Sequence, residues 1–323
     1  MGDRSPVGIV LGSHMPPERI VATAGRAEEL GFGELWFSED CFFSGAFAGI
    51  AAALGATNEI PIGLGVASAV TRHPALLAME TATMSRLHGG RFWPGVGLGV
   101  PFWLGQLGLM PRSPLGAVRE CVDALRRLLD GEELTENGLF AFDAVALTHR
   151  PEERLPIYLG MVGPRGLELA GEIADGTVLS VLAGTDYVRW ARERIADGGG
   201  SRDHRVVTYV LYSVDADGQA AKEAVRDAVA FYLHAMPDNA LSDVYGIQPQ
   251  LQELVAGGAD MIAREMPAAW LDDLAVAGDP DEAVGLIRAL LDAGSDSVCL
   301  WLFPLDHGEE VLELTAREVL PRL

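Results

Sequence analysis

Short apolar segments alternate along most of the chain with segments that have helical spacing. The apolar segments are rich in Val, Ile, Leu and aromatic residues and are bounded by Gly or Pro, a pattern typical of buried strands in a parallel sheet. The segments between them place apolar residues three and four positions apart, which predicts amphipathic helices. We expect eight strands, at Val7–Gly12, Gly33–Ser38, Ile62–Val66, Arg91–Gly99, Pro156–Gly160, Gly176–Val181, Val206–Val214 and Ser297–Phe303.

The alternation of strand and helix indicates an α/β fold. Strict alternation favours a parallel sheet, and eight repeats match a (β/α)8 TIM barrel better than an open doubly wound sheet, which is the competing arrangement. We therefore expect one barrel domain over residues 1–323, with its chemistry at the carboxyl ends of the strands. The expected helices are Pro17–Leu30, Ala46–Ala56, Pro74–Leu87, Pro114–Leu129, Arg165–Ala174, Asp186–Ala196, Gln219–Ala235, Trp270–Val276, Asp281–Asp292 and Glu309–Leu320.

Two segments interrupt this alternation. Residues 132–148 alternate apolar and polar positions around Asn137-Gly138, a dipeptide typical of the turn of a β-hairpin. Residues 236–263 show no clear period, so we expect an irregular excursion that serves as a lid or a surface segment. We interpret both as insertions into the barrel.

The helices expected at Ala46–Ala56 and Pro74–Leu87 carry small or apolar residues on most of their faces. A helix that covers a barrel needs only one apolar stripe. Small residues also allow two helices to approach each other closely. We therefore predict a homodimer that forms through these two helices.

Charge and composition exclude several classes of function. The net charge is −22, so a nucleic acid, which needs a basic surface, is not an expected partner. Lys222 is the only lysine, which argues against Schiff-base chemistry and a phosphate-binding P-loop. An anionic ligand would need arginine, backbone N–H groups or a helix N-terminus. No pair of His or Cys residues has metal-ligand spacing, so we expect neither a metal site nor a metal-dependent hydrolase.

Targeting signals are not expected. No uncharged apolar run reaches the roughly 18 residues of a transmembrane helix, so a membrane is not an expected partner. The first residues, MGDRSPVGIV, lack the basic and long apolar regions of a signal peptide. Cys41, Cys121 and Cys299 are odd in number and widely spaced, which fits a reduced, cytoplasmic protein.

Two carboxylates, Glu39 and Asp40, follow the second expected strand. Neighbouring carboxylates at a barrel mouth act as acid and base when their environments differ, whereas the structural alternative is a helix cap with a solvated neighbour. His14, after the first strand, is a candidate proton donor. His73 is another, although a His directly before a helix-starting Pro more often packs or caps. Arg72 is a candidate contact for an anionic ligand.

Glycines mark three further strand ends. Gly63 and Gly65 lie within Ile62–Pro74, and glycines inside a strand indicate that a ligand or another backbone approaches closely. The turn 160–166 precedes a helix and presents backbone N–H groups that suit an anion. Residues 95–100, GVGLGV, lack the GxGxxG spacing of a dinucleotide-binding fold. Aromatic residues past the strand ends are candidates for the wall of a pocket for a planar or apolar small-molecule substrate: Phe42, Phe43, Phe102 and Trp103.

Five segments together resemble the bacterial luciferase-like superfamily of flavin and deazaflavin enzymes, in particular its methylenetetrahydromethanopterin reductase branch, which uses coenzyme F420. The segments are AEELGFGELWFSED, IGLGVASAVTRHPALLAMETATMSRLHGGRF, GVGLGV, LPIYLGMVGPRGLELAGEIADGTVLS and AVAGDPDEAVGLIRALLDAGSDSVCLW. They follow the family order over almost the whole chain. The resemblance implies a (β/α)8 barrel with an insertion, usually dimeric, which agrees with the interpretation of the residues themselves.

The resemblance also implies which residues meet the cofactor. A non-prolyl cis peptide behind the cofactor ring would fall at Gly65–Val66. Glu39 matches an acidic position near the ring, and the turn at Gly160–Gly163 would meet the phosphate and ribityl region. The expected cofactor contacts are Glu39, Gly65, Val66, Ala67, Gly97, Gly99, Gly160, Met161, Val162, Gly163 and Arg165.

One position departs from the family pattern. Several deazaflavin members have a His after the acidic residue, where this chain has Asp40. Either Asp40 handles the proton, or another residue such as His14 does, or the reaction needs no enzyme proton there. The expected catalytic residues are therefore Glu39, Asp40 and His14.

The main functional hypothesis is an F420-dependent oxidoreductase that moves a hydride between reduced deazaflavin and a C=C, C=N or C=O group of a small molecule. An FMN-dependent two-component monooxygenase is the alternative, because the same strand end and phosphate turn serve both cofactors. A flavin-binding protein without catalysis is the third hypothesis, motivated by the replaced His. The sequence does not predict the substrate.

Overall fold

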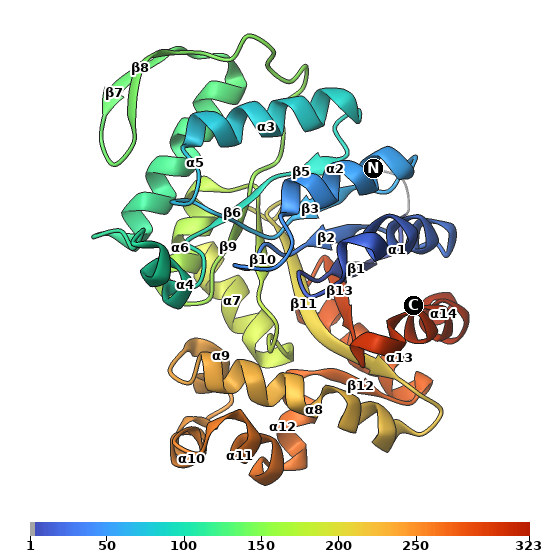
Figure 1. Ribbon diagram of the computed structural model, residues 1–323. Helices are drawn as coiled ribbons and strands as arrows, with labels where there is room; N and C mark the ends of the chain where they lie inside the picture. Colours follow the sequence, from blue (N-terminus) through green and yellow to red (C-terminus); the bar gives the residue numbers. More distant parts are fainter. Residues whose placement is uncertain (1–3) are drawn as a thin grey trace.

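The main feature of the computed structural model, which describes residues 4–323, is a curled parallel sheet surrounded by helices (Figure 1). Neighbouring strands follow the order β4-β6-β9-β10-β11-β13-β1-β2-β3-β5, and β12 pairs with β11. The strands of this sheet are β1 (Val7–Leu11), β2 (Leu35–Phe37), β3 (Ile62–Leu64), β4 (Ala67–Ser68), β5 (Phe92–Trp93), β6 (Gly95–Gly97), β9 (Tyr158–Gly160), β10 (Gly176–Leu179), β11 (Arg205–Val214), β12 (Val276–Gly278) and β13 (Ser297–Leu302).

The helices connect successive strands and cover the outside of the sheet (Figure 1). They are α1 (Pro17–Glu29), α2 (Ala46–Ala56), α3 (Pro74–Leu87), α4 (Pro101–Leu107), α5 (Pro114–Asp130), α6 (Pro164–Ile173), α7 (Thr185–Asp197), α8 (Gly218–Ala235), α9 (Ala240–Asp243), α10 (Gln248–Val255), α11 (Gly258–Glu265), α12 (Ala268–Leu274), α13 (Pro280–Ala293) and α14 (Gly308–Glu318), with short 3-10 helices at Leu305–His307 and Leu320–Arg322.

The ends of α13 illustrate how local sequence sets the bounds of a helix. The carboxylate of Asp279 accepts bonds from the backbone N–H groups of Asp281 and Glu282, and the N–H of Asp279 donates to the Glu282 carboxylate. This reciprocal capping box satisfies N–H groups that have no partner inside the helix. At the other end Gly294 has a φ of 117°, a conformation that favours glycine, and ends the helix.

The parallel strands share one direction, so their carboxyl ends lie on one side of the sheet. β1 lies between β13 and β2, with Val7 opposite Val298 and Ile9 opposite Leu35. Every residue of β1 is buried. Continuous burial explains the uninterrupted apolar runs of the sequence, because helices cover one face of the sheet and side chains fill the other.

Two of the strands expected from the sequence are each broken in two. The strand expected at Ile62–Val66 is present as β3 and β4, and the one expected at Arg91–Gly99 is present as β5 and β6. Gly65 and Val66 separate β3 from β4, and the peptide bond between these two residues is cis, which confirms the prediction for that bond. β3 pairs with β5, and β4 pairs with β6. The chain therefore has an α/β fold with a curled parallel sheet, and the expected strands occur in the expected order.

The hairpin predicted within residues 132–148 is present as an antiparallel pair, β7 (Leu134–Asn137) and β8 (Ala141–Val145). Asn137 is opposite Ala141, and the turn between them contains Gly138. Figure 1 shows the hairpin extending away from the sheet beside α3 and α5.

Residues 236–263 differ from the expected irregular structure. They contain α9, α10 and most of α11, and Figure 1 shows these helices gathered with α12 against α8. Ile262 is fully buried, and Arg226 on α8 donates to the carbonyl oxygen of Ala263 at 3.2 Å. Helices of four to eight residues are too short for the apolar period to be recognised.

Two other elements were not expected. α4 occupies Pro101–Leu107, outside the helices expected from the sequence. The helix predicted at Trp270–Val276 ends as α12 at Leu274, and Val276 begins the short strand β12. No helix within residues 4–323 has the length and apolar character needed to cross a bilayer.

Candidate active site

The break between β3 and β4, at Gly65 and Val66, lies against the side chain of Tyr209 on β11. A Cβ atom at Gly65 would come within 2.0 Å of the Tyr209 hydroxyl oxygen, so only glycine fits. Tyr209 is 4% exposed, and its hydroxyl has no hydrogen-bond partner among residues 4–323. Burial raises the pKa of Tyr209 well above its usual value, so the hydroxyl stays neutral. A buried, unpartnered donor therefore lies beside the predicted ring position.

Val66 packs its side chain against glycines of two neighbouring strands. A Cβ atom at Gly97 would lie 2.6 Å from Val66 Cγ2, and one at Gly160 would lie 2.9 Å from Val66 Cγ1. The packing of Val66 therefore requires glycine at both positions, whatever else they contact. Ala67 is fully buried, and Gly99 has a φ of 90°, which favours glycine.

Glu39 and Arg72 form an ion pair with two hydrogen bonds at the carboxyl end of the sheet. The Arg72 Nη1 and Nη2 atoms lie 2.5 Å and 2.6 Å from the two carboxylate oxygens of Glu39. The pair connects the end of β2 to the segment between β4 and α3. The sequence made Arg72 a candidate contact for an anionic ligand, but in the structure its guanidinium binds Glu39.

Asp40 has a different environment from its neighbour. It accepts a bond of 2.6 Å from the hydroxyl of Ser13, which follows β1 and is 2% exposed. The N–H of Ser13 donates to the hydroxyl of Ser38 at 2.9 Å, so the loops after β1 and β2 hold each other. No lysine or arginine within residues 4–323 forms an ion pair with Asp40.

His14 lies in a group of aromatic rings next to Asp40. Its ring centre is 4.3 Å from that of Phe43 and 5.9 Å from that of Trp301. Trp301 is in turn 6.2 Å from the ring of Tyr232 on α8. Burial, together with the charge of Asp40, raises the pKa of Tyr232. We call His14, Phe43, Trp301 and Tyr232 the aromatic wall.

The structure therefore brings the three predicted catalytic residues, Glu39, Asp40 and His14, to the same end of the sheet. Of the predicted pocket aromatics, only Phe43 belongs to the aromatic wall. Phe42 and Phe102 are 65% and 69% exposed and project from the loop after β2 and from α4.

The turn after β9 leads into α6 and has an open tip. No atom lies within 4 Å of a Cβ atom built on Gly163. The Tyr187 hydroxyl donates to the carbonyl oxygen of Val162 at 2.6 Å and holds this turn in place. Arg165 is exposed and forms no ion pair with any residue from 4 to 323. Met161 is buried and belongs to the core.

His73 has a structural role. Its Nδ1 accepts the N–H of Ala75 at 3.2 Å at the start of α3, and its Nε2 lies 3.2 Å from the carbonyl oxygen of Ala141 on β8. Its ring also packs against Phe140 and Phe142. These contacts attach the hairpin to α3 and support the packing or capping interpretation.

Four residues of this region were not predicted from the sequence: Ser13, Tyr209, Tyr232 and Trp301. A serine after a strand and aromatic residues within apolar runs are ordinary in any core. Their importance depends on neighbours from other strands, which no local pattern reveals.

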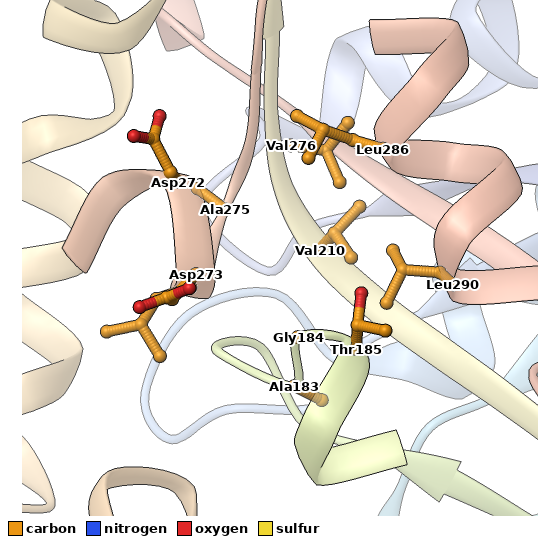
Figure 2. A pocket seen from close by; sticks show the side chains of 11 residues that line it. Ala183, Gly184, Thr185, Val210, Asp272, Asp273, Ala275, Val276, Leu286 and Leu290 are labelled. Carbon is orange, nitrogen blue, oxygen red and sulfur yellow. The ribbon is translucent and has the colours of Figure 1, made fainter. Parts of the chain in front are cut away.

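A small cleft between α7, β11, α12 and α13 is a separate feature (Figure 2). Its volume is about 20 Å³, enough for roughly one water molecule, so it does not hold an organic cofactor. Figure 2 shows Val210, Val276 and Leu290 on one side of it and Asp272 and Asp273 on α12 on the other. Across residues 4–323, no three His, Cys, Asp or Glu side chains are grouped closely enough to hold a metal ion.

The chain is similar to known proteins over almost its whole length. The chain is 27% identical over 97% of its length to the 5,10-methylenetetrahydromethanopterin reductase of Methanolobus tindarius, 99% of which is covered. It is 28% identical over 95% of its length to the F420-dependent glucose-6-phosphate dehydrogenase of Nakamurella multipartita, 93% of which is covered. The solved structure of the coenzyme F420 dependent tetrahydromethanopterin reductase from Methanopyrus kandleri superposes with a TM-score of 0.87, at 26% identity, with 99% of each chain covered.

A family model described as luciferase-like monooxygenase matches residues 3–297. The match includes the ends of β1, β2, β4, β6 and β9, where the candidate site lies. The chain therefore belongs to the luciferase-like monooxygenase family.

Proposed function

We propose that this protein is an F420-dependent oxidoreductase that transfers a hydride between reduced deazaflavin and a C=C, C=N or C=O group of a small molecule. The observation that carries the proposal is full-length similarity to proteins named for F420-dependent reactions, over 95% or more of this chain. The break at Gly65 and Val66 supports it, because it lies at the carboxyl ends of the strands, where barrel enzymes place their chemistry.

A closed (β/α)8 barrel in one domain is part of this proposal. β4 and β5 stand at the two ends of the strand order. β3 and β4 are halves of one broken strand, and β3 pairs with β5 while β4 pairs with β6. This broken strand therefore contacts both ends of the sheet, which supports closure. Closure would place the carboxyl ends of the strands around one mouth, as the chemistry requires. The hairpin and the helices of residues 236–263 would be insertions into this single domain.

The residues at the mouth fit a flat ring that carries a phosphate-bearing tail. Bound F420 supplies the hydride, and the protein supplies shape and hydrogen bonds. The unpartnered hydroxyl of Tyr209 offers a donor beside Gly65. The open start of α6 at Gly163 offers N–H groups to a phosphate, and Arg165 would add a positive charge there.

Asp40 is the group that would exchange the proton that accompanies hydride transfer. Its side-chain partner is the neutral hydroxyl of Ser13, so it can change protonation state without breaking an ion pair. The aromatic wall would offer a substrate an apolar surface. His14 is the alternative proton carrier at the same mouth.

Anaerobic titration of the apoprotein tests this function. We expect F420 fluorescence to change on binding, and reduced F420 to be oxidised only when an acceptor such as an aldehyde, imine or enoyl compound is present. Tight FMN binding with oxygen uptake, and no F420 binding, would replace the proposal with a two-component monooxygenase. Cofactor binding without turnover of any acceptor would favour a non-catalytic flavin-binding protein.

We also propose a homodimer formed through α2 and α3. On α3, Leu76 and Met79 are each 52% exposed and Leu87 is 71% exposed, and exposed apolar surface of this kind is typical of an interface. Light scattering at micromolar concentration should give twice the mass of one chain, and Met79→Glu should give monomers. A monomeric wild-type protein would overturn the dimer. The three unpaired cysteines support a reducing, cytoplasmic location, which stays a prediction.

A further inference from the structure

Arg72 is held on three sides. Its Nη atoms bind Glu39, its Nε lies 3.6 Å from Oε2 of Glu80, and its guanidinium carbon lies 4.9 Å from the centre of the Phe47 ring. These partners come from the end of β2, from α3 and from α2. A guanidinium used in this way has little remaining capacity for an anionic ligand.

Glu39 is fixed as firmly as its partner. Each carboxylate oxygen accepts one bond from Arg72, and Oε1 also accepts from the N–H of Ala46 at the start of α2, at 3.4 Å. Pairs with two charge-assisted bonds are strong and set orientation as well as distance. Both oxygens of Glu39 are therefore occupied by partners from this chain.

Asp40, the adjacent residue, faces neutral groups instead. Its side-chain partner is the hydroxyl of Ser13. Burial raises the pKa of Tyr209 and of Tyr232, with Asp40 as a further cause, so both remain neutral at ordinary pH. Among residues 4–323, no lysine or arginine forms an ion pair with Asp40.

We propose that Arg72 is a positioning residue that occupies both carboxylate oxygens of Glu39 and holds them in place, so that Asp40 is the one of the two carboxylates that exchanges a proton with the substrate. This inference rests on the proposed function. In the reducing direction, bound reduced F420 would supply the hydride that the substrate carbon gains. The π electrons of the substrate double bond move to its other atom, which takes the proton and leaves Asp40 as a carboxylate. Glu39 stays bound to Arg72 throughout.

Four variants of the full-length protein test the pair: Arg72→Gln, Arg72→Lys, Glu39→Gln and the double variant Arg72→Gln/Glu39→Gln. Arg119→Gln is the matched control, because Arg119 forms an equally short two-bond pair with Glu172, at 2.6 Å and 2.5 Å, on the outer helices. The measurements are kcat and KM, F420 affinity by fluorescence, and the melting temperature of the apoprotein.

We expect Arg72→Gln to lower kcat by about 100-fold, because small displacements of a positioned group have effects of this size. KM and F420 affinity should change by less than about threefold, and Arg72→Lys should recover part of the loss. The kcat of the double variant should lie within about threefold of the kcat of Arg72→Gln, because the two residues act as one unit. Arg119→Gln should leave kcat unchanged.

Three results would overturn the proposal. The first is a loss of F420 affinity of about tenfold or more in Arg72→Gln with kcat unchanged, which would make Arg72 a cofactor ligand. The second is a lower melting temperature of Arg72→Gln with kcat, KM and F420 affinity unchanged, which is the result expected of Arg119→Gln. The third is additive melting-temperature shifts for Arg72→Gln and Glu39→Gln. This last measurement needs no cofactor, so it separates failure of the pair from failure of F420 to bind.

Discussion

Glu34, just before β2, forms an ion pair with Arg205 at the start of β11, at the end of the sheet opposite the candidate active site. Their side chains are 4% and 19% exposed. Glu34 also accepts bonds from the indole N–H of Trp36 at 2.8 Å and from the hydroxyl of Ser297 at 2.7 Å, and Arg205 lies over the ring of Trp93. Polar groups that satisfy one another therefore fill this end of the sheet.

Replacing Arg205 with Met should leave the charge of Glu34 buried without its cation. We expect the free energy of unfolding to fall by about 3–5 kcal/mol, because an uncompensated buried charge is costly. Urea unfolding measures the change. Arg119→Gln, which breaks an exposed pair, should cost less than about 1 kcal/mol. Equal losses in the two variants would show that water solvates Glu34 when its partner is removed.

The order of strands and helices could be predicted from the sequence because apolar period, Gly and Pro are local properties. Pairing between polar side chains could not. Glu34 and Arg205 are 171 residues apart, and Glu39 and Arg72 are 33 apart. Which polar groups meet depends on how distant strands align, and that alignment is set by packing of the whole core.

In the candidate active site, too, features set by local sequence could be predicted, and contacts between distant residues could not. Gly65 and its neighbours indicated a close approach, and the family resemblance placed a cis peptide at Gly65–Val66, which the structure contains. The residue that approaches Gly65, Tyr209, was not predicted, because it lies in an apolar run typical of any buried strand. The short helices of residues 236–263 were missed because their stability comes from packing on α8.

Gly65→Ala should disturb the candidate site directly. The added Cβ atom would meet the Tyr209 hydroxyl oxygen at 2.0 Å, and overpacking of this kind costs about 1–3 kcal/mol. We expect lower stability in urea and weaker F420 binding measured by fluorescence. Tyr209→Phe removes the clashing atom, so the double variant Gly65→Ala/Tyr209→Phe should recover part of the lost stability.

Gly25→Ala on α1 is the control for this experiment, because a Cβ atom there has no neighbour within 4 Å. It should be neutral or stabilising by up to about 1 kcal/mol, since alanine favours the helix. If Gly65→Ala behaves like Gly25→Ala in both assays, the close approach of Tyr209 does not constrain the site.

Asp40→Asn should remove the exchangeable proton while keeping the size of the side chain. General acid–base catalysis contributes about 10²–10⁴-fold, so we expect kcat to fall within that range while F420 affinity changes by less than about threefold. Anaerobic steady-state kinetics and fluorescence titration measure the two quantities. Asp143→Asn, an exposed site on the hairpin, should change neither. A larger loss of kcat in His14→Asn than in Asp40→Asn would identify His14 as the proton carrier instead.

His204 should make the stability of the protein depend on pH. It lies between β10 and β11, is 3% exposed, and its Nε2 is 2.8 Å from the hydroxyl of Thr177. Burial, helped by the charge of Arg192, lowers the pKa of His204 from 6.5 to about 4. The unfolded chain therefore binds this proton more tightly than the folded protein does. The stabilising contribution is fully present above about pH 6.5 and is lost as the pH falls from about 6.5 towards 4.

Urea unfolding between pH 7.5 and pH 4 tests this dependence. Over this range wild-type protein should lose about 3 kcal/mol more than His204→Asn, because the variant lacks the titrating ring. His149→Asn, which changes an exposed histidine, should follow the wild-type curve. The absolute stability of His204→Asn does not matter, because the comparison is between slopes. Parallel curves for wild type and His204→Asn would show that burial does not shift the pKa of His204.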